Sequence, residues 1–120
     1  MKSNEYKDKL ISLIGKEVSG HIDRLLGSHH PHHKNILYTV NYGYIFDLIA
    51  PDGEEQDAYY LGVNKPIKEF AGIVIAIVER IDDKEDKLIV VPKGMNFTDE
   101  EIEEQIYFQE QYFKHRIRRA

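Results

Sequence analysis

The chain has 120 residues, of which 42% are hydrophobic and 31% charged, a balance that favours one folded domain over a disordered or membrane-embedded chain. Its 21 acidic and 16 basic side chains give a net charge of -5, so the overall field disfavours a nucleic-acid partner. Because cysteine is absent, disulfides, thiolate zinc sites and cysteine nucleophiles are excluded.

The first element that the sequence predicts is a short helix over residues 4–15. Tyr6, Leu10 and Ile14 recur every four residues and give the helix one apolar side, and Gly15 is a typical helix end. The chain start lacks the apolar stretch of a signal peptide, and no apolar run reaches the roughly 18 residues that cross a bilayer. We therefore expect a cytoplasmic protein with no membrane partner.

Between residues 16 and 92 the pattern changes to short β-strands. Pro51-Asp52-Gly53 is a strong turn that should join two of these strands as a hairpin. The run 73–78 is apolar at every position, which favours a central strand buried on both faces. β-branched and aromatic residues predict strands within 17–22, 36–40, 44–49, 57–63, 73–78 and 87–91.

The last predicted element is a helix over 98–117. Thr98 and Glu101 match a capping box, and acidic first turns and a basic last turn agree with the helix dipole. About five strands between two helices predict a single domain over 1–120, mainly β with flanking helices (α+β). The expected architecture is an OB-type five-stranded barrel over 16–92, with a short N-terminal helix and a longer C-terminal helix.

Two acidic turns are the first candidates for chemistry. The segment 52–57 holds four carboxylates, and the segment 82–87 mixes four carboxylates with two lysines. Clustered carboxylates bind hard divalent cations such as magnesium, and the alternative for each turn alone is an ordinary solvated turn. Loops at one end of a small barrel converge, so the two turns together predict a shared cation site unless they lie at opposite ends.

Tyrosines and histidines between these elements have two interpretations each. Tyr38, Tyr42 and Tyr44 could donate hydroxyl hydrogens to phosphate, or they could serve as half-buried packing. Four histidines in the segment 28–34 could form a mobile polar loop, a lid or pH-sensitive phosphate contact, or a site for a softer metal. They are His29, His30, His32 and His33.

Three segments in this order resemble the soluble inorganic pyrophosphatases of family I. They are Tyr38-Thr39-Val40-Asn41-Tyr42-Gly43-Tyr44-Ile45, then Asp52-Gly53-Glu54-Glu55-Gln56-Asp57, then Asp82 through Lys87-Leu88-Ile89-Val90-Val91-Pro92. The resemblance covers roughly residues 22–114. It implies an OB-type barrel that binds magnesium, or manganese, between carboxylates and pyrophosphate and hydrolyses pyrophosphate to two phosphates.

The resemblance also implies a role for individual residues. Asp52, Asp57 and Asp82 would bind metal, as would either Glu85 or Asp86. Phosphate contacts fall to Arg24, Tyr42, Lys87 and Lys114. Catalytic roles fall to Asp57 and to Glu54, which would steer the attacking water.

The chain departs from the family pattern in ways that indicate a diverged, N-terminally shortened member. Glu54 replaces the family's middle aspartate, and Glu55 replaces a proline. Phe113 replaces the tyrosine of the family's Tyr-Lys pair, of which Lys114 keeps the lysine. The N-terminal hairpin is reduced to the segment around Lys16 and Glu17. A displaced water-orienting carboxylate predicts a slow enzyme, since a general base contributes about 10²–10⁴-fold.

Two other functions stay open at this point. The same barrel could be a non-catalytic or weakly catalytic module that binds a phosphorylated metabolite or nucleotide. A nucleic-acid binder would use the tyrosines for stacking and the terminal arginines for phosphates, but the acidic turns would repel such a backbone. The sequence sets neither the number of metal ions nor whether the chain is a homo-oligomer.

Overall fold

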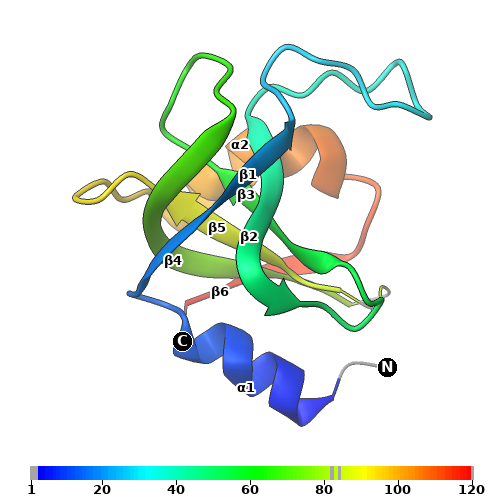
Figure 1. The fold of residues 1–120 in the computed structure, drawn as a ribbon. Coiled ribbons are helices and arrows are strands. Elements are labelled where there is room, and N and C mark those ends of the chain that lie inside the picture. Colours follow the sequence, from blue (N-terminus) through cyan, green and yellow to red (C-terminus); the bar gives the residue numbers. More distant parts are fainter. Residues whose placement is uncertain (1–2, 82, 84, 120) are drawn as a thin grey trace.

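A computed structural model describes residues 3–81, 83 and 85–119, and the strands among them form a closed β-barrel (Figure 1). The strand order is β1-β2-β3-β5-β4, and β4 pairs with β1 to close the barrel. The β3–β5 pair is parallel and the other pairs are antiparallel, which confirms the predicted five-stranded barrel. The strands are β1 (Glu17–Arg24), β2 (Asn41–Ile49), β3 (Glu55–Tyr60), β4 (Glu69–Arg80) and β5 (Lys87–Val91).

β2 and β3 form the predicted hairpin, in which Tyr44 lies opposite Asp57. Their turn contains Gly53 at φ 87°, in the left-handed region that glycine adopts without strain. Gly43 on β2 has a different role, because a Cβ at this position would lie 1.9 Å from the backbone oxygen of His21 on β1. Glycine therefore permits the close approach of β1 and β2 at this corner of the barrel.

β4 connects the two halves of the barrel. Its first half pairs with β1 and its second half with β5, and the register with β5 shifts between Val74 and Ala76. Such an irregularity lets a strand bend from one neighbour to the next. Val74, Ala76, Ile77 and Val78 are buried, as expected for the central strand over 73–78.

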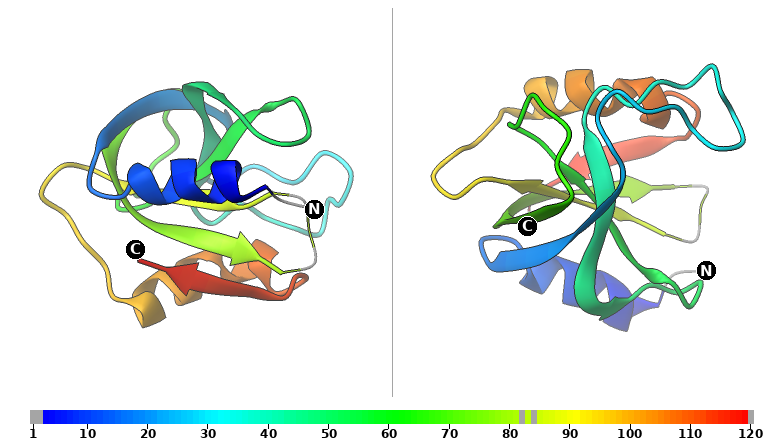
Figure 2. Two further views of the ribbon diagram at one scale, coloured as in Figure 1. Left: turned by 90° about the horizontal axis from the view of Figure 1, so that it is seen from below. Right: turned by 45° about the horizontal axis from the view of Figure 1, so that its top comes forward.

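The two helices cover different parts of the barrel (Figure 2). Helix α1 (Asn4–Ser12) lies across one end, where Tyr6 and Leu10 enter the apolar core inside the barrel. Helix α2 (Asp99–Glu110) packs on the outer side over a second core, and its capping box is present as predicted. No helix in the described part of the chain is long and apolar enough to cross a membrane.

The C-terminal helix is shorter than the predicted 98–117, because β6 (His115–Arg118) takes up its last residues and pairs antiparallel with β4. The pairing gives hydrogen-bond partners to backbone groups along the edge of β4. Arg116 and Arg118 also pair with Glu79, whose side chain is only 7% exposed. These contacts join distant segments, so local helical spacing could not reveal them.

Two more predicted elements differ from the structure. The helix predicted over 4–15 ends at Ser12, and Gly15 lies in the turn that follows it at φ 89°. The strand predicted over 36–40 is absent from the described residues, where Leu37 makes a single bridge to His29. This segment belongs to a long connection between β1 and β2 rather than to the barrel.

Candidate active site

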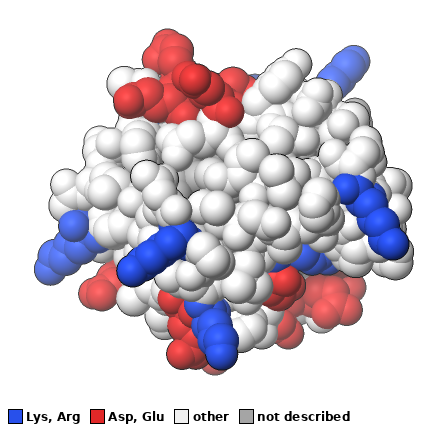
Figure 3. Space-filling view, turned by 90° about the horizontal axis from the view of Figure 1, so that it is seen from above, with Lys and Arg blue, Asp and Glu red and all other residues white. Residues whose placement is uncertain are grey.

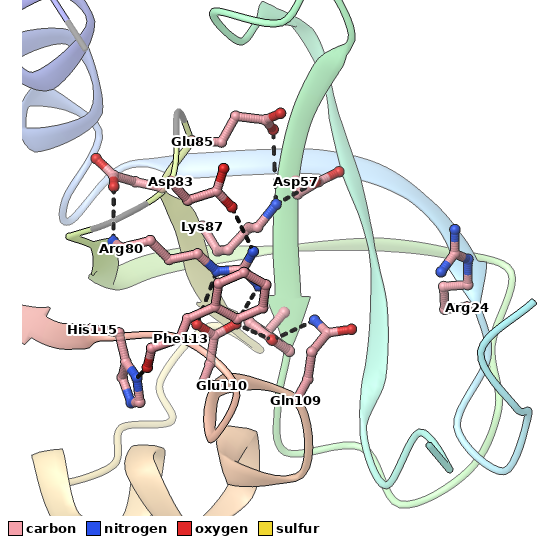
Figure 4. Close-up of polar contacts among 12 residues, drawn as sticks. Arg24, Asp57, Arg80, Asp83, Glu85, Lys87, Gln109, Glu110, Phe113 and His115 are labelled. Atoms are coloured by element: carbon pink, nitrogen blue, oxygen red, sulfur yellow. Dashed lines mark hydrogen bonds and ion pairs between the residues drawn. The ribbon is translucent and has the colours of Figure 1, made fainter. Parts of the chain in front are cut away.

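The segment 52–57 and the described residues of the segment 82–87 lie at the same end of the barrel (Figure 1). In the parallel β3–β5 pair Ala58 lies opposite Leu88, so the residues before them, Asp57 and Lys87, also lie side by side. Lys87 Nζ is 2.6 Å from Asp57 Oδ2 and 3.8 Å from Glu85 Oε1 (Figure 4). The carboxyl group of Glu85 also hydrogen-bonds Asp52 on the other turn.

The contact between Glu85 and Asp52 brings two carboxyl groups together. Burial, followed by the hydrogen bond with Asp52, raises the pKa of Glu85 to about 7. The same hydrogen bond holds the pKa of Asp52 below its usual value. With a pKa of about 7, Glu85 is only partly ionised near neutral pH.

Tyr42 lies beside this cluster, with Lys87 Nζ 6.0 Å from the centre of its ring. Burial, and next the negative charge of Asp57, raise the pKa of Tyr42 well above its usual value. Its hydroxyl therefore stays protonated at neutral pH. A phenol in this state can donate a hydrogen bond to an anionic oxygen.

A cavity of about 640 Å³ opens beside Asp57 and Tyr42, between the connection that follows β1 and the end of α2. Arg24, the last residue of β1, lines it and donates from Nη1 to the Tyr38 hydroxyl at 3.2 Å. Figure 4 shows Arg24 well apart from the ion pairs around Lys87. The cavity is lined by Asp23, Arg24, His30, His33, Asn35, Ile36, Tyr38, Tyr42, Asp57, Arg80, Gln109, Tyr112 and Phe113.

The barrel fold is shared with inorganic pyrophosphatases. A pyrophosphatase structure from Neisseria gonorrhoeae matches 85% of this chain and 75% of its own, with a TM-score of 0.61 and 19% identity. One from Ehrlichia chaffeensis matches 88% and 87%, with a TM-score of 0.66 and 14% identity. One from Helicobacter pylori matches 90% and 83%, with a TM-score of 0.55 and 13% identity. At these identities the likeness shows the fold alone.

No family model and no curated protein matches the sequence. Support for the residues that resemble pyrophosphatase site residues therefore comes from their position in the structure. Those that it brings together at the acidic end or along the cavity are Arg24, Tyr42, Asp52, Asp57, Glu85 and Lys87.

Other predicted site residues lie apart from this group. Glu54 is exposed at the turn, where its backbone N–H donates to Asp52 Oδ1 at 3.0 Å. Asp86 is buried, and its Oδ1 accepts the backbone N–H of Arg80 at 3.0 Å, so it fixes the start of the β4–β5 turn. Lys114 is exposed and outside the cavity lining.

The structure does not place the remaining three predicted residues, Lys16, Glu17 and Asp82, in this group. Lys16 and Glu17 lie at the opposite end of β1 from Arg24 and are exposed. Asp82 falls outside the described residues. Among the residues that the structure describes, no group of three or more histidines or carboxylates has the geometry to hold a metal ion as placed.

Sequence reasoning missed a buried ion pair at the cavity wall. Arg80 donates from Nε and Nη2 to the two carboxylate oxygens of Glu110 at 3.0 and 2.6 Å, and from Nη1 to Asp83 at 2.9 Å (Figure 4). The Phe113 ring lies 3.7 Å from the guanidinium carbon. Burial works against the charge of Arg80, but the hydrogen bonds and charge of Glu110 outweigh it and raise its pKa.

Glu110 also anchors a chain of buried hydrogen bonds. It accepts from the Tyr59 hydroxyl at 2.6 Å, which in turn accepts from Gln109 Nε2 at 2.6 Å. Gln109 Oε1 accepts from the Tyr38 hydroxyl at 2.7 Å, and Tyr38 is the partner of Arg24. The network links the end of α2 to Arg24 and so fixes the cavity wall. An arginine ending an apolar strand was the one local sign of it.

Proposed function

We propose that the protein hydrolyses inorganic pyrophosphate to two phosphates with magnesium as cofactor, manganese being the alternative. The observation that supports this best is the convergence of Asp57, Glu85 and Lys87 beside a cavity, on a barrel shared with pyrophosphatases. Pyrophosphate is strongly anionic, so an acidic protein can hold it only with cations and local basic side chains.

The acidic end of the barrel has the donor chemistry that magnesium prefers. Asp52, Asp57 and Glu85 offer carboxylate oxygens within one cluster. Asp52 and Glu85 would hold a divalent cation through their carboxylate oxygens, and its charge would oppose the effects that raise the pKa of Glu85. Asp82 would be a further ligand by the resemblance. When bound, magnesium would acidify a coordinated water and neutralise phosphate charge.

The side chains of the cavity would hold and orient the substrate. Arg24 would bind one phosphate group through its guanidinium, and the protonated hydroxyl of Tyr42 would donate to a phosphate oxygen. Lys87 would offset the charge of Asp57 and of the substrate. Asp57 lines the cavity and Glu54 lies on the exposed turn, so Asp57 is the better placed to accept a proton from the attacking water.

A binding module for a phosphorylated metabolite is the second candidate. It is favoured by the positions of Glu54 and Lys114, which the resemblance assigns to the site and which are exposed outside the cavity lining. Asp86 likewise accepts a hydrogen bond from the backbone N–H of Arg80. A site with these departures could retain anion binding through Arg24 while turnover is slow or lost.

The decisive experiment measures phosphate release from pyrophosphate with magnesium, with manganese and without metal. We expect metal-dependent release that falls at least about 100-fold in Asp57→Asn, because the substitution removes both a carboxylate ligand and a base. Asp99→Asn is the matched control, since Asp99 pairs with Arg119 on the surface far from the cavity lining.

The two candidate functions then separate by a second measurement. Calorimetry with methylenediphosphonate, which cannot be hydrolysed at its bridge, reports binding without turnover. Magnesium-dependent binding together with no phosphate release from pyrophosphate would favour the binding module. Release that is equal in wild type and Asp57→Asn would reject the assignment of this site.

A further inference from the structure

The cavity beside Arg24 is larger than two linked phosphate groups require. Its volume of about 640 Å³ falls within the range of about 300–1,000 Å³ typical of pockets for organic ligands. The groups suited to phosphate, Arg24, Tyr42 and Asp57, account for only part of the lining. The rest of the cavity is lined by other side chains, whose chemistry indicates what else could bind there.

A row of aromatic rings leads from the phosphate end of the cavity to the histidine segment. The ring centres of Tyr42 and Tyr38 are 5.7 Å apart, and those of Tyr38 and His30 are 6.3 Å apart with planes only 14° from parallel. His33 lies next to His30, with ring centres 4.9 Å apart. The row provides a continuous wall of planar side chains behind the cavity.

The histidine segment is held by its own hydrogen bonds. His30 Nδ1 accepts the backbone N–H groups of His32 and His33 at 3.1 and 3.2 Å. The Nδ1 of His29 donates to the backbone oxygen of Lys34 at 2.8 Å, and Ile36 O accepts from His30 N at 2.9 Å. These contacts define the tautomer of His30 in its neutral form, which carries its proton on Nε2 and can donate from there.

His30 is neutral near pH 7. Burial, Arg24 and the neighbouring histidines lower its pKa from the ordinary value. Its ring therefore adds a planar surface and a hydrogen-bond donor without adding charge. The middle of the face seen from above is largely uncharged, and acidic and basic side chains lie around its rim (Figure 3).

A second aromatic wall comes from the segment after α2. Phe113 lies over Arg80, and Tyr112, which is 58% exposed, lines the same cavity. Exposed aromatic rings at a cavity rim can bind a planar ligand group, because their apolar faces are only partly covered by the protein. The cavity thus has a phosphate end and an end built of planar side chains.

We propose that the cavity accepts a diphosphate ester with a planar ring, of the nucleoside diphosphate class, with its phosphates at Arg24 and Tyr42 and its ring between His30 and Tyr112. For turnover this rests on the proposed function. Water oxygen bonds to the terminal phosphorus, and the bridging P–O bond breaks with its electron pair leaving on the monophosphate ester. Asp57 accepts the proton of the water and returns it to solvent.

The test compares two non-hydrolysable ligands by calorimetry, with and without magnesium. They are methylenediphosphonate and the α,β-methylene analogue of adenosine diphosphate. We expect the nucleotide analogue to bind at least about tenfold more tightly to the wild-type protein, since stacking of one base on an aromatic ring supplies an affinity difference of this order.

Variants assign this difference to the aromatic wall. Tyr112→Ala should lose about tenfold in affinity for the nucleotide analogue and keep its affinity for methylenediphosphonate. Tyr107→Ala is the matched control, because Tyr107 is 54% exposed on α2 and outside the cavity lining. It should change neither affinity.

The outcomes separate this inference from the proposed function. Equal binding of the two ligands, or no effect of Tyr112→Ala, overturns the inference even where pyrophosphate is hydrolysed. Tighter binding of the nucleotide analogue that depends on Tyr112 supports the inference even where pyrophosphate is not hydrolysed. Failure of both ligands to bind overturns the inference and removes the support for the proposed site.

Discussion

Two clusters of charged side chains lie at the two ends of the β4–β5 turn, and they are neutralised in different ways. At the end of β4, Glu110 is fully buried and both of its oxygens accept hydrogen bonds from the guanidinium of Arg80. At the start of β5, Glu85 has another carboxyl group, that of Asp52, as its hydrogen-bond partner. Glu110 thus has a bidentate arginine partner. Glu85 has Lys87 at 3.8 Å, but burial and the contact with Asp52 still raise its pKa.

The difference indicates separate purposes for the two clusters. A buried carboxylate in bidentate contact with an arginine is a structural element, because removal of either partner leaves an uncompensated charge. A partly buried carboxyl group beside another carboxyl group is costly to ionise, and a bound cation would favour its ionised form. The Arg80–Glu110 pair therefore fixes the cavity wall, whereas the Asp52–Glu85 pair is where the proposed function would hold a cation.

The largest expected effect is that of Arg80→Met on stability. Glu110 would keep its burial and lose its guanidinium partner, which should lower the free energy of unfolding by about 3–5 kcal/mol. Urea unfolding measures the change. Arg116→Met is the matched control: Arg116 is 64% exposed and its partner Glu79 keeps Arg118, so we expect a loss of about 0–1 kcal/mol.

A double variant sharpens this test. Arg80→Met combined with Glu110→Leu removes both buried charges, and we expect most of the lost stability to return. If the double variant is as unstable as Arg80→Met, the loss comes from packing around Phe113 rather than from the unpaired carboxylate.

The sequence predicted the acidic cluster but not the Arg80–Glu110 pair. Asp52, Asp57 and Lys87 belong to two segments that the sequence predicts as converging turns of an OB-type barrel, and the structure brings them together. Arg80 and Glu110 lie on a strand and a helix, and their pairing depends on how α2 packs on the barrel. Locally, the sequence signals this pairing only by an arginine at the end of an apolar strand.

The same distinction explains the fold predictions. The hairpin at Gly53 and the capping box at Thr98 depend on adjacent residues, and both are present as predicted. The end of the last helix was wrong because residues 115–118 pair with β4 instead. The segment 36–40 is rich in β-branched and aromatic residues, but it belongs to the cavity wall and the β1–β2 connection.

A smaller effect of opposite sign is expected for Glu85→Gln. Without metal at pH 8, the substitution removes a carboxylate that is poorly neutralised, so the free energy of unfolding should rise by about 1–2 kcal/mol. With saturating magnesium, the wild-type protein should gain more stability than the variant. Thermal unfolding with and without magnesium measures both changes. A variant that gains as much from magnesium as wild type would remove Glu85 from the cation site.

The pH dependence tests the same carboxyl pair. The pKa of Glu85 is raised to about 7 in the folded protein, above an unfolded value of about 4.3. The folded state therefore binds more protons between these values, and the contribution of Glu85 to stability is full below about pH 4.3 and lost as pH rises through 7. Metal-free urea unfolding at pH 5 and pH 8 should show this loss in wild type and not in Glu85→Gln.

The smallest effect should come from His115, which is paired within the protein like Arg80 but lies nearer the surface. Burial opposes its charge, but Nδ1 donates to Phe113 O at 2.8 Å and Nε2 donates to Glu103 at 2.8 Å, so its pKa is raised. Its stabilising contribution is present below an unfolded pKa of about 6.5 and is lost as pH rises through the higher folded pKa. We expect His115→Asn to cost about 0.5–1 kcal/mol at pH 5.5 and less at pH 8.5. An equal cost at both values would mean that the ring acts through packing, and that His115, unlike Arg80, is not held by charge pairing.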